Sequence, residues 1–448
     1  MFLIGISTLL PYNAFLSAPD FLQQYYYDIV AGDGGGSSGN ETLQYENWWN
    51  TLPTFSALLG VFPNLIVQVL LLLPCGQRIV MYTRFCTSIL IMMACLVIVL
   101  LPCFIKEGSS ITEATALIIL LLSITACGAA TGLIQATIFS FTAELPPIYT
   151  GTAMTGMALS GLIASILRII SKASNATEPL VDAFIYFGVS ISILVLTLLC
   201  IHFFLKKNPY ALHHTHILSG ETPTRLHSRR RRESILHYRN RNGRGSQNQI
   251  TLEENEDMER GNESTINGEG HNGTGRNTWQ VLLRTRYFLL CMFGIFATTF
   301  IVFPGVTIEV QPENDWYAIL VVTFYNAGDV LGRFGSSSRD NAILLVAEQY
   351  LLGMTLLRFL IFVPLLIILA SDVIDGNISL LEISLTICFL LGITNGALGT
   401  SCAIHAPKNE ETRRNKNIAG NAISCSLLGG CTIGALIAIG ITFALQKD

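Results

Sequence analysis

Long apolar segments alternate with short polar segments along most of this chain. A helix needs about 20 apolar residues to cross the hydrocarbon of a membrane. Eleven segments approach or exceed this length, and each predicts a transmembrane helix, because lipid offers no partners to backbone N–H and C=O groups. The runs lack the period-two alternation of a transmembrane barrel. The predicted spans are Phe2–Ala18, Leu52–Leu73, Thr83–Ile105, Thr115–Phe141, Thr152–Ile170, Val181–Leu205, Tyr287–Val306, Ala318–Phe334, Leu345–Leu369, Leu380–Ile404 and Ile418–Leu445.

Two of these spans are unusual. The first has no basic lead of the kind that precedes a secretory signal, so a retained helix is predicted. The eighth contains Asp329 and Arg333 and is therefore the least apolar of the set.

A long polar stretch divides the spans into six and five. Residues 206–278 are rich in Arg, Asn, Gly, Glu and Ser, a composition that cannot bury enough apolar surface to fold. The predicted organisation is a six-helix bundle over 1–205, a disordered cytoplasmic loop over 206–278 and a five-helix bundle over 279–448. The basic first half of the loop could contact anionic membrane lipids. Ser234 follows a run of arginines, as in the sites of basophilic kinases, although a simple solvated tether also explains the stretch.

Composition agrees with a polytopic membrane protein. The chain is 51% hydrophobic and 13% charged, whereas soluble proteins carry about 25% charged residues. The 11 cysteines are an odd number, nearly all lie in apolar runs, and no CxxC motif occurs. We therefore expect packing cysteines rather than disulfides, and no metal or cofactor.

Basic residues indicate the orientation. The loops after the even-numbered spans are the basic ones and hold most of the Lys and Arg residues, which favours a cytoplasmic N-terminus and an external C-terminus. Three Asn-x-Ser/Thr sequons then fall in external loops, at Asn40, Asn175 and Asn377, and are predicted glycosylation sites.

Ionisable side chains inside a span are costly and mark functional sites by default. Asp329 and Arg333 are four residues apart on one helix face, with Asn326 on the same stripe. One interpretation is a self-neutralising pair at a helix end. The interpretation we favour is a polar grip on a hydroxylated substrate, with the carboxylate accepting from hydroxyls and the guanidinium donating.

Other polar groups in the spans suggest a planar ligand. Gln135 has an amide that can donate and accept at once, so it could read a heterocycle or join helices. Tyr12 could stack on a planar ring or simply pack. No nucleophile–base set, phosphate loop or HExxH motif occurs, so no enzyme is predicted. No basic domain with stacking aromatics suggests nucleic-acid binding, and no obligate protein partner is evident.

Several segments, taken in order, resemble the equilibrative nucleoside transporter family. They are Ser7-Thr-Leu-Leu-Pro-Tyr-Asn13, Leu133-Ile-Gln135, Leu145-Pro-Pro-Ile-Tyr-Thr150, Thr155-Gly-Met-Ala-Leu-Ser-Gly161, Phe303-Pro-Gly-Val-Thr-Ile-Glu309, Phe324-Tyr-Asn-Ala-Gly-Asp329-Val-Leu-Gly-Arg333, Arg358-Phe-Leu-Ile-Phe-Val-Pro364, Thr394-Asn-Gly396, Ala406-Pro-Lys408 and Ala419-Gly420. Each piece is common alone, but the ordered set covers nearly the whole chain.

The resemblance implies a major-facilitator-like fold and passive, alternating-access movement of purine and pyrimidine nucleosides. It also implies roles for single residues. Asp329 and Arg333 would hold the ribose hydroxyls, and Gln135 would contact the base. Leu9, Tyr12 and Leu16 would form an apolar wall, Asn326 would support its helix face, and Arg84 and Arg358 would belong to a cytoplasmic gate.

The sequence departs from the family at three positions. Tyr12 replaces the commoner Trp, Asn417 stands where some members carry an acidic gate residue, and Asn64 is more polar than a base-facing position requires. The gate ion pair and the base preference are the properties that these changes affect.

The expected function is facilitative nucleoside transport, most naturally in the plasma membrane. The alternative in the same class is a proton-coupled nucleoside, nucleobase or organic-cation carrier, possibly of an internal membrane, although Arg333 favours the ionised form of Asp329. A membrane receptor or scaffold is a third interpretation, and it leaves the intramembrane Asp, Arg and Gln unexplained.

Overall fold

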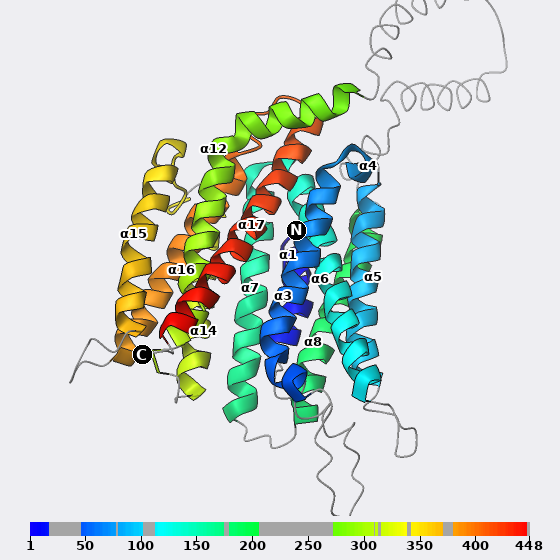
Figure 1. Ribbon diagram of the computed structural model, residues 1–448. Helices are drawn as coiled ribbons and strands as arrows, with labels where there is room; N and C mark the ends of the chain where they lie inside the picture. The colour runs from blue at the N-terminus through cyan, green and yellow to red at the C-terminus, as the bar shows by residue number, and fades with distance from the viewer. Residues whose placement is uncertain are drawn as a thin grey trace, which may run out of the picture.

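The computed structural model describes residues 1–17, 46–77, 79–101, 113–173, 179–205, 272–308, 310–311, 315–337, 342–370 and 380–445 (Figure 1). Within these ranges, one long helix corresponds to each of the eleven predicted spans. The helices are α1 (Phe2–Ser17), α3 (Glu46–Leu72), α5 (Met81–Leu100), α6 (Glu113–Ala143), α7 (Pro147–Ala173), α8 (Pro179–Cys200), α12 (Asn272–Val302), α14 (Asp315–Ser337), α15 (Leu351–Ala370), α16 (Leu380–His405) and α17 (Arg413–Leu445). Short helical turns connect or extend some of them: α4 (Pro74–Gln77), η3 (Ile201–Leu205), α13 (Gly305–Ile308) and η4 (Glu348–Tyr350).

The main difference from the prediction is the start of α12. This helix begins at Asn272, inside the predicted long loop, and not at Tyr287. Its first turns carry Arg284 and Arg286 and extend beyond the apolar run, which is why hydrophobicity did not reveal them. The helix ends at Val302, close before Pro304, whose ring disfavours helical backbone at the preceding residue.

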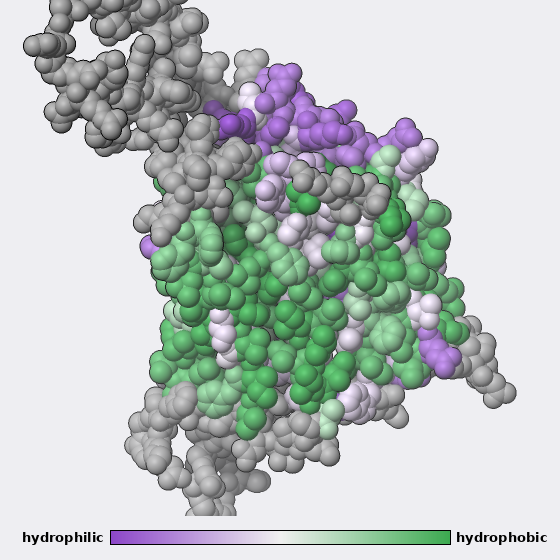
Figure 2. Space-filling model, turned by 180° about the vertical axis from the view of Figure 1, so that it is seen from behind, coloured by the Kyte–Doolittle hydropathy of each residue, from purple (hydrophilic) through white to green (hydrophobic). Residues whose placement is uncertain are grey.

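Eight of the described helices are long and apolar enough to cross a membrane. The described apolar segments of α1 and α3 are shorter, and α14, with its charged pair, is not among the eight. The face shown in Figure 2 carries a broad hydrophobic band, with hydrophilic residues gathered beyond one edge of it. The chain is therefore an integral membrane protein with an all-helical fold.

Burial separates central helices from peripheral ones. The spanning windows of α12 and α6 are 61% and 56% buried inside the protein, whereas that of α15 is 28% buried. α6 is apolar around its whole circumference; its second half is largely buried, whereas Ile118 and Leu122 near its start are exposed. α15 instead directs side chains such as Leu356 and Leu360 outward, where lipid would cover them.

α14 lies closely against α16 because glycines face the partner backbone from both sides. A Cβ added at Gly392 would overlap the carbonyl oxygen of Tyr325, and one added at Gly396 would overlap that of Asp329. Small residues allow this close approach in membrane helices. The contact fixes the level of α16 relative to Asp329 and Arg333.

Helices from before and after the long loop meet along two seams. In the first, α7 lies along α14, where the Asn326 amide donates to Ser165 Oγ at 2.8 Å and the hydroxyls of Thr155 and Ser337 are 3.3 Å apart. In the second, α6 lies along α17, where Ser140 Oγ donates to the Asn417 carbonyl oxygen at 3.2 Å. The candidate site lies beside these seams.

Candidate functional site

The ion pair predicted from the four-residue spacing on α14 is present. Arg333 Nη2 and Nε lie 2.9 Å and 3.0 Å from Asp329 Oδ2. Both residues are 5% exposed, so the pair is buried. Burial of a carboxylate or guanidinium without a partner costs several kcal/mol, and the pairing offsets that cost.

Neighbouring helices orient both members of the pair. The Asn395 amide of α16 donates to Asp329 Oδ1 at 2.9 Å. Arg333 Nη1 donates to the Met154 carbonyl oxygen of α7 at 3.2 Å and lies 3.6 Å from its sulfur. The pair is thus held between α7 and α16, the helices that flank α14.

The pair keeps spare hydrogen-bonding capacity. A carboxylate offers about four lone-pair positions, and three contacts to Asp329 are present, two from Arg333 and one from Asn395. A guanidinium has five N–H groups, and the contacts of Arg333 described above engage three of its nitrogens. A ligand with adjacent hydroxyls could therefore donate to Asp329 and accept from Arg333 without breaking the pair.

Arg358 extends the network on the side of α15. Its guanidinium donates to the carbonyl oxygens of Ile295 and Leu391, both at 2.9 Å, and to Thr299 Oγ1 at 2.8 Å. It also lies 3.4 Å from Asn395 Oδ1. The structure thus places Arg358 in the interior, one side chain away from Asp329.

Gln135 and Tyr12 lie on helices of the other half of the chain. Gln135, on α6, is 2% exposed, and its Oε1 has no hydrogen-bond partner among the described residues. The Tyr12 ring lies against Gly60 of α3, where an added Cβ would overlap the ring. Leu9 packs against the main hydrophobic core, and Leu16 lies on α1 at a position whose side chain is outside the described structure.

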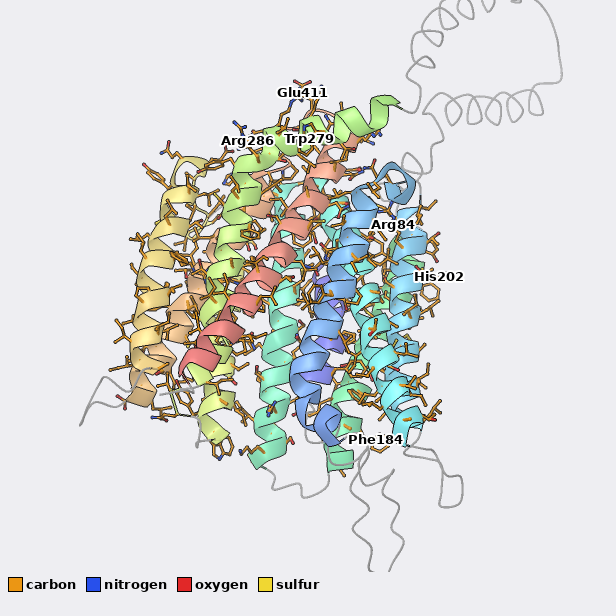
Figure 3. All side chains as sticks on the ribbon, viewed as in Figure 1. Arg84, Phe184, His202, Trp279, Arg286 and Glu411 are labelled. Atoms are coloured by element: carbon orange, nitrogen blue, oxygen red, sulfur yellow. The ribbon has the colours of Figure 1, made fainter. Side chains whose placement is uncertain are left out.

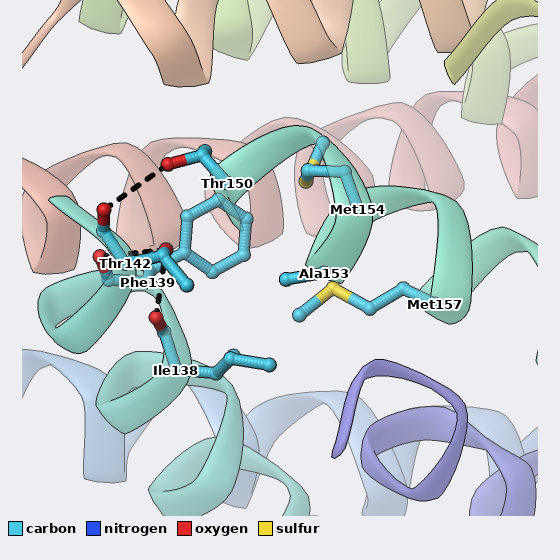
Figure 4. A pocket seen from close by; sticks show the side chains of 7 residues that line it. All are labelled: Ile138, Phe139, Thr142, Thr150, Ala153, Met154 and Met157. Atoms are coloured by element: carbon cyan, nitrogen blue, oxygen red, sulfur yellow. Dashed lines mark hydrogen bonds between the residues drawn. The ribbon is translucent and has the colours of Figure 1, made fainter. Parts of the chain in front are cut away.

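A small pocket links α6 to the Arg333 side of the site (Figure 4). Phe139 and Ile138 of α6 face Met154 and Met157 of α7 across it, and Met154 is the residue that accepts from Arg333. The lining side chains leave no room there for even a water molecule. Pockets for small organic ligands usually measure about 300 Å³ or more, so helices must separate before such a ligand fits here.

Comparison with known proteins decides the family. The sequence profile described as nucleoside transporter matches residues 121–443, most of the chain. The chain belongs to the nucleoside transporter family.

Two relatives show how far the likeness extends. Nucleoside transporter 1.1 of Leishmania donovani is 24% identical, over 98% of this chain and 91% of the relative. Equilibrative nucleoside transporter 4 of Homo sapiens is 25% identical, over 100% of this chain and 83% of the relative. The resemblance to this family found in the sequence is confirmed, and membership of a transporter family means that the chain is not an enzyme.

A solved structure supports the fold. The proton:xylose symporter XylE, a major facilitator superfamily protein, superposes with a TM-score of 0.51 at 11% identity, covering 100% of this chain and 88% of that one. At this identity the likeness shows the architecture alone. The major-facilitator-like, all-helical fold is confirmed.

The predicted gate residue Arg84 lies near the start of α5, toward the end of this transporter that also carries Arg286 and Glu411 (Figure 3). Its Nη2 donates to the carbonyl oxygen of Gly76 in α4 at 2.6 Å. Within the described ranges no carboxylate pairs with it, and Asn417 has a buried Oδ1 without a partner. Its role in a gate stays a prediction.

Asn326 binds across the α7–α14 seam. Its amide nitrogen donates to Ser165, and its side-chain carbonyl group lies beside Gly161.

The predicted glycosylation sites Asn40, Asn175 and Asn377 and the predicted phosphorylation site Ser234 lie outside the described residues.

Several contributors to the network were not predicted as site residues, among them Asn395, Thr299 and Met154. Asn395 carried a signal, because an amide inside a span requires a partner. Thr299 carried a weaker one. Met154 contributes its backbone oxygen, which side-chain chemistry does not reveal.

Proposed function

We propose that this member of the nucleoside transporter family moves nucleosides passively by alternating access. The observation that carries the proposal is the buried Asp329–Arg333 pair, which retains free lone pairs and N–H groups beside the α7–α14 seam. A ribose presents adjacent hydroxyls that both donate and accept. Such a group matches a carboxylate beside a guanidinium.

The rest of the candidate site would accommodate a purine or pyrimidine base. Gln135 would hydrogen-bond to its polar edge, and Tyr12, Leu9 and Leu16 would form an apolar wall. Asn326 would hold the α14 face against α7, as its bond to Ser165 indicates. These roles rest on the family resemblance together with the burial of Gln135.

The small volume of the pocket in Figure 4 supports a change between two states. Both seams contain close contacts through small residues: a Cβ at Gly151 would overlap Ser337, and one at Gly420 would lie 2.5 Å from the Phe139 carbonyl oxygen. Such surfaces can part and re-form without large side-chain rearrangement. Arg84 would take part in the cytoplasmic closure, whereas the gate role that the resemblance implies for Arg358 would be exerted from the interior, where it bonds to Ile295 and Leu391.

The pairing favours a facilitative over a proton-coupled mechanism. Protonation of Asp329 would leave the buried Arg333 without its counter-charge, which is costly. A proton-coupled carrier, or one of an internal membrane, is the alternative function.

Placement in the cell belongs to the same proposal. The transporter would lie in the plasma membrane with its N-terminus in the cytoplasm and its C-terminus outside. Two bundles, 1–205 and 279–448, would be joined by a cytoplasmic loop, with glycans at Asn40, Asn175 and Asn377.

Uptake of radiolabelled adenosine and uridine by cells that produce the protein tests the proposal. Saturable uptake that is lost in Asp329→Ala, with unchanged amounts of protein at the surface, is the expected result. Absence of saturable uptake of any nucleoside would overturn the function, and normal uptake by Asp329→Ala would overturn the site.

A further inference from the structure

Three helices, α3, α6 and α17, meet at one level of the molecule, and their contacts fix how they are aligned. Gly132 of α6 lies against Asn64 of α3, since an added Cβ would be 2.5 Å from the Asn64 carbonyl oxygen. Gly420 of α17 lies against Phe139 of α6 in the same way. Leu72 of α3 packs on a small cluster formed by Ile418 and Ala419 of α17 with Val281 of α12.

These contacts place four polar side chains at the same level. Residues four apart lie one turn apart on the same face of a helix. Gln68 is one turn from Asn64 and one turn from Leu72, and Gln135 is one turn from Phe139. Ser424 is one turn beyond Gly420, and Asn421 lies between the face of α17 toward α6 and the face toward α3.

All four side chains are buried and incompletely hydrogen-bonded. Gln68, Gln135, Asn421 and Ser424 are 0%, 2%, 4% and 0% exposed. The side-chain oxygen of each has no hydrogen-bond partner among the described residues. The Gln68 amide nitrogen already donates to Asn64 Oδ1 at 2.8 Å, which leaves its own oxygen as a free acceptor.

Burying a polar atom without a partner is unfavourable, so four at one level require an explanation. A purely structural cluster would have its members bonded to one another, as Gln68 is to Asn64. The free oxygens indicate instead a surface that awaits donors from a ligand.

Residues around the closed pocket in Figure 4 contact both this level and the ion pair. Phe139, which contacts Gly420, and Met154, which accepts from Arg333, both line it. A ligand held by Arg333 at one end and reaching past this pocket would arrive at the polar side chains of α3, α6 and α17.

We propose that Gln68, Asn421 and Ser424, together with Gln135, select nucleosides whose base carries N–H donors on its polar edge. The inference rests on the proposed nucleoside transport and adds three specificity-determining residues to it. Their oxygens would accept from a ring N–H or an exocyclic amino group. A base with ring acceptors but no such N–H would leave these oxygens unpaired and would bind poorly.

Inosine and purine riboside make a matched pair of probes. They share the ribose and the purine ring, but only inosine has a ring N–H on the six-membered ring. The ratio of their kcat/KM values, measured by uptake in the same cells, does not depend on the amount of transporter. The variants are Asn421→Leu and Ser424→Ala, with Ser426→Ala as control, because the Ser426 hydroxyl donates to the Leu289 carbonyl oxygen and so lies on another face of α17, the one toward α12.

The wild type should prefer inosine by about tenfold or more, and each variant should lower the ratio by about threefold to tenfold, the effect of one hydrogen bond. Ser426→Ala should keep the wild-type ratio. Because Asn421 Oδ1 and Ser424 Oγ have no hydrogen-bond partner within the described ranges, the variants should unfold at the same or a higher temperature.

An unchanged ratio in both variants would overturn the inference, as would a lowered unfolding temperature with an unchanged ratio, which would assign these residues to structure. A wild type that transports adenosine and uridine but treats the two probes alike would overturn this inference and leave the proposed function standing. A wild type that transports no nucleoside would overturn both.

Discussion

The substitution Asp329→Asn removes one charge from the centre of the site and keeps its shape. In the wild type, Oδ2 accepts from Arg333 at 2.9 Å and 3.0 Å, and Oδ1 accepts from Asn395 at 2.9 Å. An amide cannot accept on both sides. If its oxygen faces Arg333, its NH₂ group meets the NH₂ group of Asn395.

Asn395 cannot simply rotate to relieve this conflict. Its own oxygen accepts from Thr299 at 2.9 Å and faces Arg358 at 3.4 Å. Rotation would turn the Asn395 NH₂ group toward the Arg358 guanidinium, which cannot accept, although the Thr299 hydroxyl could accept from it while donating to Ile295. The variant therefore loses the counter-charge of Arg333 and strains the network, and breaking a buried ion pair costs about 3–5 kcal/mol.

The effect of Asp329→Asn on transport is estimated separately from its effect on stability. If one ribose hydroxyl donates to the carboxylate, loss of this charge-assisted bond should reduce kcat/KM by about 10- to 100-fold. The reduction should affect uridine and spare 2′,3′-dideoxyuridine, which lacks the hydroxyls. The assay is uptake of both compounds by the same cells, expressed as a ratio, with thermal unfolding of the purified protein followed in parallel.

A second variant separates stability from recognition. Asp329→Asn combined with Arg333→Gln removes both charges, so no unpaired charge is buried. Part of the lost stability should return, whereas the preference for uridine should not. The reasoning would be refuted by a uridine-to-dideoxyuridine ratio that stays at the wild-type value in Asp329→Asn, because the carboxylate would then hold helices and not ribose.

Three further predictions concern packing around the site. Gly396→Ala should lower the unfolding temperature markedly, since its Cβ would overlap the α14 backbone, whereas Gly440→Ala, with no neighbour within 4 Å, should leave it unchanged or raise it; thermal unfolding in detergent measures both. Arg358→Lys should also destabilise, because an ammonium cannot reproduce the bonds to two carbonyl oxygens and a hydroxyl, and equal unfolding temperatures for variant and wild type would contradict this. Gly60→Ala should displace the Tyr12 ring and raise KM for nucleosides. If the two residues act together, combining it with Tyr12→Ala should raise KM little further, whereas additive increases in KM would argue against this.

The number and order of the helices followed from the sequence because each span is a continuous apolar run. α14 was the least certain span for the same reason that it is functionally interesting: Asp329 and Arg333 lower its hydrophobicity. The first turns of α12 escaped prediction because they extend past the apolar run and carry Arg284 and Arg286.

The partners of the ion pair could not be predicted in this way. Asn395 reaches Asp329 because of the register between α14 and α16. This register is set by backbone contacts at four glycines, Gly328, Gly332, Gly392 and Gly396. Arg358 was expected at a cytoplasmic end, yet its bonds to Ile295 and Leu391 place it in the interior. The spacing of residues in the sequence predicts contacts within one helix. Contacts between helices can be identified only when the packing of the helices is known.

Facilitative transport is the central claim, and the final distribution of a nucleoside across a membrane tests it most directly. Purified protein in sealed liposomes should bring internal uridine to the external concentration and no higher, with or without an inward proton gradient. Accumulation above the external concentration that collapses when the proton gradient is dissipated would contradict the account and show a proton-coupled carrier.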